Sequence, residues 1–221
     1  MAKDKLFQRR RAERAEAEKR KAKKRSEKRR FLIVCEGKTE ETYFQFYVDQ
    51  QESLVAEVTS ECGTSPMCVT SHAISLAEKD GDYDEVFAVF DGDTPDTGNF
   101  DRALTAANES ENFMAIHSTP CFEYWLWLHF KYSTKPFVGI KNARSAGTQM
   151  LSELKSCSGM SEYVKGEQLN FPAFIGKLDT ALNHAKRVEK HSTEVGERNP
   201  STKVHHLIKA IENIEDDITT E

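Results

Sequence analysis

Three acidic side chains follow two short apolar segments, and their positions are the best chemical clue in the sequence. Glu36 comes directly after residues 31–35, and Asp91 and Asp93 come directly after residues 85–90. Both segments have the composition of strands buried on two faces. Ligands of open α/β sheets bind outside the carboxyl ends of the strands, so we expect the three carboxylates to gather at one sheet edge. Gathered carboxylates repel one another unless a cation joins them, and hard oxygen ligands of this kind suit Mg²⁺ or Mn²⁺.

Each of these acids also has a simpler interpretation. A single Glu or Asp after a strand is usually a turn residue or a helix cap, and Asp-Gly-Asp occurs in many loops. It is the combination at two strand ends, separated by helical sequence, that favours a catalytic cluster. Gly37 and Gly92 beside the acids permit an unusual backbone and leave room for a substrate.

The segments that must position these acids alternate between strand and helix. The expected strands are residues 31–35, 55–59, 85–90 and 112–117, and the expected helices begin at Thr39 and cover 71–79, 100–108 and 121–130. This alternation predicts βαβ units and an α/β fold with a mainly parallel sheet. Beyond Pro136 we expect helices at 148–156, 171–190 and 201–214, the last one entered through an Asn or Ser cap in Asn199-Pro200-Ser201-Thr202.

Composition suggests three parts: a basic helical or disordered tail at residues 1–30, an α/β metal-binding domain at 31–135, and a helical extension packed on the sheet at 136–221. The tail carries 15 Lys and Arg residues against five acids, whereas the whole chain has 31 basic and 36 acidic residues. Two interpretations of the tail stay equally open. It is either an arm that contacts phosphate backbones or a solvated charged helix that aids solubility or partner docking.

Several classes of protein are disfavoured. No run of 18 apolar residues predicts a membrane span, and the N-terminus lacks the features of a signal peptide. The five Cys residues contain no CxxC pair, which argues against a cysteine zinc site or a disulfide framework. We therefore expect the protein to be located in the reducing cytoplasm. Gly37-Lys38-Thr39 lacks the upstream glycine of a P-loop, so nucleotide hydrolysis of that type is not expected.

The Glu-Gly after the first strand and the Asp-x-Asp after a later one resemble the TOPRIM domain of topoisomerases, primases and certain nucleases. More closely, four motifs in order are similar to the RloB family: Ile33–Glu40, Val89–Asp93, Pro120–Leu126 and Asn199–Thr202. The resemblance runs from about residue 30 to the C-terminal helix, and it implies a TOPRIM-like Rossmannoid sheet. It also implies an association with prokaryotic defence loci, often beside an AAA or ABC-type ATPase. Related TOPRIM effectors act as nucleases, some of them on transfer RNA.

The resemblance also assigns roles. It makes Glu36 a metal ligand or general acid/base, and it makes Asp91 and Asp93 the metal-binding pair. Glu123 opens a helix after Pro120 and is a candidate fourth carboxylate, with stabilisation of the helix dipole as an equal alternative.

Two further residues are weaker candidates. Lys38 is a candidate to offset phosphate charge, although an exposed loop lysine is commoner. His117 ends the strand before Glu123 and is a candidate site residue, although a satisfied strand-end histidine is commoner.

Other chemical groups are expected to be structural. The aromatic residues between Phe122 and Phe130 suggest core packing rather than a platform on which bases stack. The pair His205-His206, like His184 with His191, has no convincing set of metal-ligand partners in the sequence, so we expect surface or structural roles.

We therefore expect a Mg²⁺-dependent nuclease that cleaves RNA, with transfer RNA a candidate, or DNA. It would act as an anti-phage effector under the control of a partner ATPase. The alternative is a non-catalytic, metal-binding regulatory subunit that docks on such an ATPase. A topoisomerase or primase is disfavoured, because the chain is too short for a domain with a DNA-linking tyrosine and shows no partner nucleotide-binding domain. The use of one or two metal ions stays open, as does the oligomeric state, a homo-oligomer included.

Overall fold

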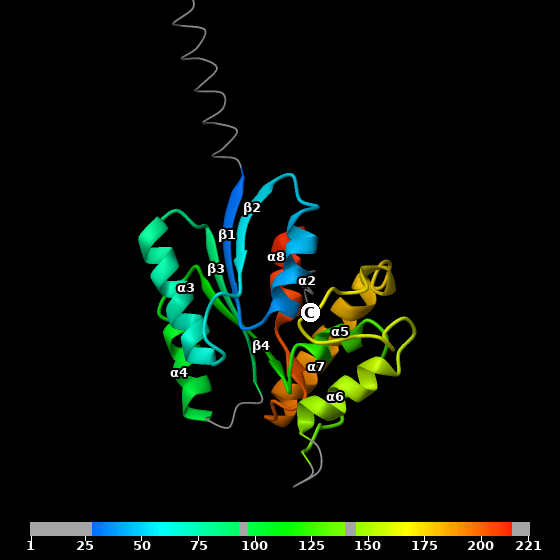
Figure 1. Ribbon diagram of the computed structural model, residues 1–221. Helices are drawn as coiled ribbons and strands as arrows, with labels where there is room; N and C mark the ends of the chain where they lie inside the picture. The colour runs from blue at the N-terminus through cyan, green and yellow to red at the C-terminus, as the bar shows by residue number, and fades with distance from the viewer. Residues whose placement is uncertain (1–27, 93–96, 140–144, 214–221) are drawn as a thin grey trace, which may run out of the picture.

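A five-stranded sheet forms the centre of the molecule. The computed structural model describes residues 28–92, 97–139 and 145–213 (Figure 1). The strands lie in the order β2-β1-β3-β4-β5. Neighbouring strands from β2 to β4 are parallel, and β5 is antiparallel to β4. The strands are β1 (Arg29–Cys35), β2 (Leu54–Thr59), β3 (Glu85–Asp91), β4 (Phe113–Thr119) and β5 (Ser201–Thr202).

Helices cover both faces of this sheet. Figure 1 shows α3 and α4 on one side, with α2, α5, α7 and α8 on the other. Helix α6 packs against α5 at the outside of the second layer. The helices are α2 (Lys38–Val48), α3 (Pro66–Asp80), α4 (Thr97–Ala107), α5 (Glu123–Leu128), α6 (Ala146–Lys155), α7 (Leu178–Val195) and α8 (Val204–Glu212), with a short 3₁₀ turn, η1 (Phe171–Ala173).

The two-residue period of the strands divides their side chains between two cores. In β3, Phe87 and Val89 join the larger core with α2, α5, α7 and α8. Val86, Ala88 and Phe90 join the smaller core with α3 and α4. These strands are apolar on both faces because helices cover both faces. The predicted mainly parallel α/β sheet with C-terminal helices is thus confirmed.

The larger core contains residues from both sides of the boundary expected near residue 135. Trp125 of α5 is fully buried together with Met150 of α6 and Val188 of α7. The C-terminal helices therefore share the apolar interior of the sheet. Residues 1–27 of the basic tail lie outside the described residues. In the described ranges, no helix is long and apolar enough to cross a membrane.

Two expectations for the C-terminal half are wrong. Ser201 and Thr202 do not begin a helix but form β5, because they pair with the otherwise free edge of β4. Helix α8 begins at Val204, whose N–H donates to Thr202 Oγ1 at 3.2 Å. The helix expected over 171–190 is also interrupted, since Gly176 adopts a left-handed φ of +73° between η1 and α7.

One earlier boundary differs as well. The helix expected from residue 71 begins at Pro66, because Ser65 caps it with its side chain and proline suits the first helical position.

The buried sheet predicts a large cost for truncating Phe87, which is 1% exposed and packs edge-on against Phe31 at 5.3 Å. We expect Phe87→Ala to lower the free energy of unfolding by about 3–5 kcal/mol in urea denaturation followed by circular dichroism. Ile175 is 69% exposed, so Ile175→Ala should change it by less than about 0.5 kcal/mol. Equal effects of the two variants would contradict the assigned core.

Candidate functional site

Glu36 and Asp91 lie at the point where the sheet's connections diverge. Strands β1 and β3 are neighbours, yet α2, which follows β1, and α4, which follows β3, cover opposite faces. Such a switch point leaves a crevice outside the carboxyl ends of the two strands, where open α/β sheets bind ligands. The Asp91 N–H donates to Glu36 Oε2 at 3.0 Å between the ends of the two strands. The structure thus brings together Glu36 and Asp91, which the sequence predicted to lie at one edge of the sheet.

Glu123 joins the same edge through the start of α5. The N–H of Phe122 donates to Asp91 Oδ1 at 2.8 Å, so the residue just before Glu123 is tied to Asp91. Glu123 is the first residue of α5, and it is 2% exposed. The Tyr163 hydroxyl donates to Glu123 Oε1 at 2.9 Å and fixes its orientation.

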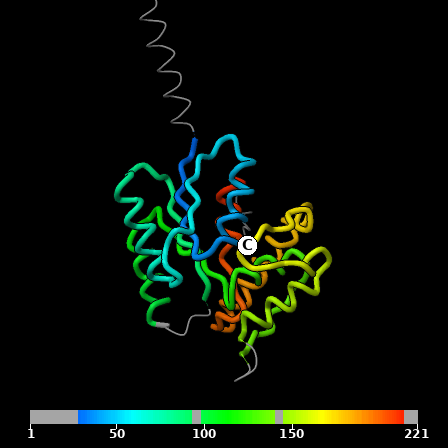
Figure 2. The backbone as a smooth tube through the Cα atoms, in the orientation of Figure 1, coloured from blue at the N-terminus to red at the C-terminus, as the bar shows by residue number. Residues whose placement is uncertain are grey.

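A lysine that the sequence reasoning missed lies between two of these carboxylates. Lys165 Nζ is 3.2 Å from Asp91 Oδ2 and 3.6 Å from Glu123 Oε2. Its segment is followed in Figure 2 from the end of α6 to the start of η1, and it lies against α2, where the Gly166 N–H donates to Thr39 Oγ1 at 2.8 Å. No periodicity or motif around Lys165 signals this placement, because the contact joins residues 74 positions apart.

Glu40 supplies a further buried carboxyl group. It belongs to the first turn of α2, is 2% exposed, and its Oε2 has no hydrogen-bond partner among the described residues. A Cβ atom at Gly37 would come within 2.9 Å of that oxygen, so glycine is required for this approach. The available signal was the spacing of Glu36 and Glu40, four residues apart at a helix start.

Burial and mutual repulsion disfavour the charged carboxylates. Burial raises the pKa of Asp91 to about 7, helped by Glu123 and Glu36 and opposed by Lys165. Burial also raises the pKa of Glu40 to about 8, with Asp91 adding to the effect, and it raises the pKa of Glu36. Burial disfavours the Lys165 ammonium, but the charges of Asp91 and Glu123 outweigh this and raise its pKa. Four carboxyl groups, those of Glu36, Glu40, Asp91 and Glu123, therefore share this edge with the single ammonium of Lys165.

This chemistry fits a hard divalent cation. Mg²⁺ and Mn²⁺ take carboxylate oxygens, and a cation would favour the charged form of Asp91, whose pKa is raised by burial and then by Glu123 and Glu36. In this structure, however, the carboxylates of Asp91 and Glu123 are arranged around the Lys165 ammonium and not around a metal ion. Among the described residues, the acids of this edge do not form a set of three whose ligand atoms all lie within 4.8 Å of one another. Asp93, the second member of the predicted pair, lies outside the described residues.

Lys38 and His117 lie away from the acidic cluster. Lys38 pairs with Glu41 on its own helix, and its side chain is 61% exposed. His117 pairs in register with Phe90 and packs edge-on against Phe100 at 5.2 Å, on the α4 side of the sheet. Burial lowers the pKa of His117 to about 4, and Lys203 adds to the effect. Lys38 pairs with Glu41, whereas the ammonium that lies beside Asp91 in the described ranges is that of Lys165.

The aromatic residues after Phe122 pack in the core, as expected, and are at most 5% exposed up to Leu128. Trp127 also lines a cavity of about 740 Å³ together with Tyr132 and Phe137, and Lys131 and Lys135 lie at its wall. None of the acids at the sheet edge lines this cavity, so it is separate from the candidate site.

The raised pKa of Glu40 predicts a pH-dependent penalty on stability. The ordinary pKa of this carboxyl group is 4.5, and its pKa in the folded protein is about 8. The stability that the protonated Glu40 contributes is therefore fully present below pH 4.5 and is lost as the pH rises through 8. Glu40→Gln removes the penalty. Its free energy of unfolding should exceed that of the wild type by a margin that grows from pH 5 to 8, up to a few kcal/mol, and then levels off.

Urea denaturation over this pH range, with a chelator present, measures the margin. The exposed Glu52 provides the matched control, Glu52→Gln, for which no such growth is expected. A constant margin for Glu40→Gln would contradict the assigned environment.

One of three comparisons with known proteins gives a match. The model of the family described as RloB-like protein matches residues 31–211, a range that contains every acid of the site. No curated protein and no solved structure matches the chain. Because the match covers most of the sequence, the chain belongs to the RloB-like protein family.

Proposed function

We propose that this protein is a Mg²⁺-dependent nuclease whose reaction centre is the acidic sheet edge around Asp91. The observation that carries the proposal is the buried excess of carboxylates at the switch point between β1 and β3. Repulsion between buried carboxylates lowers the stability of the fold. Carboxylates with perturbed pKa values are concentrated at functional sites, where such a cost is tolerated. Metal-assisted phosphodiester hydrolysis uses carboxylates of this kind to hold the cation beside the scissile phosphate.

The acids would divide between them cation binding and proton transfer. Asp91 and Glu36 would hold Mg²⁺ or Mn²⁺, with Asp93 as the expected partner of Asp91 and Glu123 at the margin. When bound, such an ion supplies positive charge to the scissile phosphate and lowers the pKa of a coordinated water. Glu36 is only half-buried and its pKa is raised, so it is suited to accept or return a proton at the reacting oxygen.

Lys165 is the candidate phosphate-binding residue. Its side chain is 49% exposed, so the ammonium reaches solvent while it contacts Asp91 and Glu123. A charge-assisted contact with a phosphate oxygen would position the substrate beside the acids. In the absence of substrate, the same ammonium would compete with a divalent cation for these carboxylates.

The family resemblance is what supports the proposed substrate class and setting. We propose RNA, with transfer RNA a candidate, or DNA as the substrate, and anti-phage defence in the cytoplasm under an AAA or ABC-type ATPase as the setting. The basic residues 1–30 would add affinity for phosphate backbones without choosing a sequence. A regulatory, non-catalytic subunit that binds the ATPase is the rival proposal.

Removing the acids should remove cleavage. Asp91→Asn and Glu36→Gln should each lower the rate by about 10²-fold or more, because they take away a cation ligand or proton carrier. End-labelled transfer RNA, other RNA and DNA, incubated with the full chain and Mg²⁺, with and without a co-expressed ATPase, report the rate and the substrate. Asp49→Asn, at the exposed end of α2, is the matched control and should cleave like the wild type.

Two results would count against the nuclease. Cleavage that survives in both variants would exclude this site as the reaction centre. Intact nucleic acid in every incubation, together with ATPase binding that Asp91→Asn leaves unchanged, would favour the regulatory subunit.

Lys165→Met should separate metal binding from phosphate binding. Without the ammonium, Mg²⁺ no longer competes for Asp91, so the Mg²⁺ concentration that gives half-maximal activity should fall. The maximal rate should also fall, by about 10²–10³-fold, because a charged phosphate contact is lost. A Mg²⁺ titration of the rate measures both. Lys155→Met, on the exposed end of α6, is the control, and an unchanged Mg²⁺ requirement in Lys165→Met would exclude the competition.

A further inference from the structure

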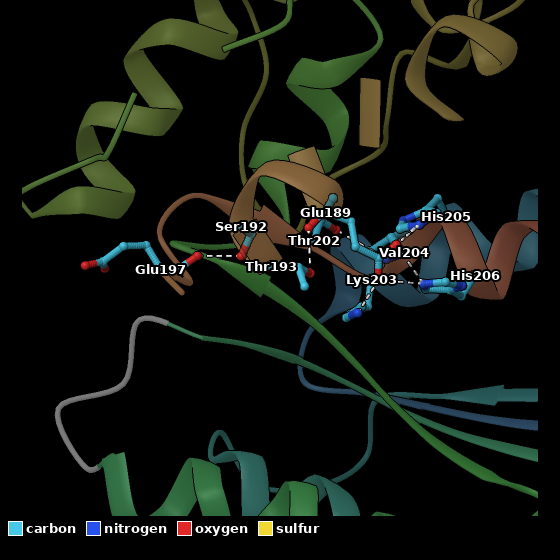
Figure 3. A network of polar contacts seen from close by, with 9 residues as sticks. All are labelled: Glu189, Ser192, Thr193, Glu197, Thr202, Lys203, Val204, His205 and His206. Carbon is cyan, nitrogen blue, oxygen red and sulfur yellow. Dashed lines mark hydrogen bonds and ion pairs between the residues drawn. The ribbon is translucent and has the colours of Figure 1, made fainter. Parts of the chain in front are cut away.

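A second polar cluster lies between the last turns of α7 and the start of α8, and Figure 3 shows it from close by. Glu189 comes from α7, and His205 and His206 come from the first turn of α8. His205 Nε2 is 2.9 Å from Glu189 Oε2. His206 Nε2 is 3.1 Å from Glu189 Oε1 and 3.2 Å from Oε2. We name these three residues the His–Glu cluster.

The ligand atoms of the cluster are close enough for one ion. The three groups lie within 4.8 Å of one another, and in the described ranges they are the set of His, Cys, Asp and Glu residues that meets this distance. A tetrahedral Zn²⁺ with ligands at about 2.0–2.1 Å has its ligand atoms about 3.3 Å apart. The nitrogen–oxygen distances of 2.9 to 3.2 Å therefore need only small movements to admit an ion.

The fold orients the two histidines before any ligand arrives. Adjacent helix residues normally diverge, yet the rings of His205 and His206 pack with centroids 4.1 Å apart and turn both Nε2 atoms to one carboxylate. The side chain of His205 is fully buried, which restricts its rotamer. Glu189 and His206 are 26% and 31% exposed, so a water molecule can reach the outer side of the cluster.

We propose that the His–Glu cluster binds one Zn²⁺ ion, with two imidazoles, one carboxylate and a water molecule as ligands. Imidazole and carboxylate are a known ligand combination for zinc, with three protein ligands and one open position. This site is distinct from the acidic sheet edge and is independent of the proposed nuclease. It also revises the expectation that His205-His206 lacks partners, since the missing ligand is supplied by α7, 16 residues away.

Lys203 is the main competitor for such an ion. Its ammonium forms an ion pair with Glu189 Oε1, so without a metal the cluster is an ion-pair network that links α7 to the β5–α8 junction. A bound ion would make the same link more strongly. This junction is close to the acidic sheet edge. The hydroxyl of Thr202 in β5 lies 2.8 Å from the hydroxyl of Ser118 in β4, and Ser118 pairs in register with Asp91.

Metal binding to the full chain tests the proposal. Chelator-treated protein is titrated with Co²⁺, a coloured probe, and then with Zn²⁺ in competition, with excess Mg²⁺ present to occupy the acidic edge. We expect one Zn²⁺ per chain, a cobalt spectrum without the charge-transfer band of thiolates, and a higher melting temperature with Zn²⁺. His206→Ala and Glu189→Gln should each weaken binding by about 10²-fold and abolish the thermal shift.

Controls make the outcomes decisive. The exposed His191 on α7 gives the matched variant His191→Ala, which should bind like the wild type. Lys203→Met should bind Zn²⁺ at least as tightly as the wild type, because the competing ammonium is gone. Unchanged affinity in His206→Ala, weaker binding in Lys203→Met, or a thiolate band from the free cysteines would overturn the proposal.

Discussion

Buried carboxylates of like charge must be held close together at one edge of the sheet, and much of the local structure serves this constraint. Glu40 and Glu123 are each 2% exposed, and burial together with their neighbours raises the pKa of Glu40 and Asp91 far above ordinary values. Backbone N–H groups compensate in part, since Phe122 donates to Asp91 and Asp91 donates to Glu36. The remaining negative charge attracts Lys165, whose segment is fastened to the start of α2 through Gly166 and Thr39.

The topology explains why the charge gathers at this place. β1 and β3 are neighbours in a parallel sheet, and the helices that follow them, α2 and α4, cover opposite faces. In open α/β sheets, ligands bind at the carboxyl ends of strands that diverge in this way. Glu36 and Asp91, at the ends of these two strands, are joined there by the hydrogen bond from the Asp91 N–H to Glu36 Oε2. The C-terminal half contributes to the same centre, because β5 extends the sheet beside β4 and α7 and α8 complete the larger core. A metal ion at the His–Glu cluster would reinforce this junction.

Sequence patterns predicted what local periodicity controls. The apolar runs gave the four parallel strands, and their ends placed Glu36 and Asp91 at one edge. Register is not contained in such runs, so the sequence could not show that His117 lies beside Phe90 and therefore on the far face from Asp91. Long-range contacts were hidden for a similar reason. Lys165, Tyr163 and the Glu189 partner of His205 come from helical or loop segments whose neighbours are fixed only by packing.

We propose that the acidic edge is a cation site in which the Lys165 ammonium takes the place of the metal ion when none is bound. The most direct test is a crystal structure of the full chain soaked in Mn²⁺, with anomalous scattering used to locate the ion. We expect an anomalous peak within about 2.3 Å of a carboxylate oxygen of Asp91, with the Lys165 ammonium moved away from Asp91. A structure with no peak at this edge, and with Lys165 still bound to Asp91 at saturating Mn²⁺, would contradict it.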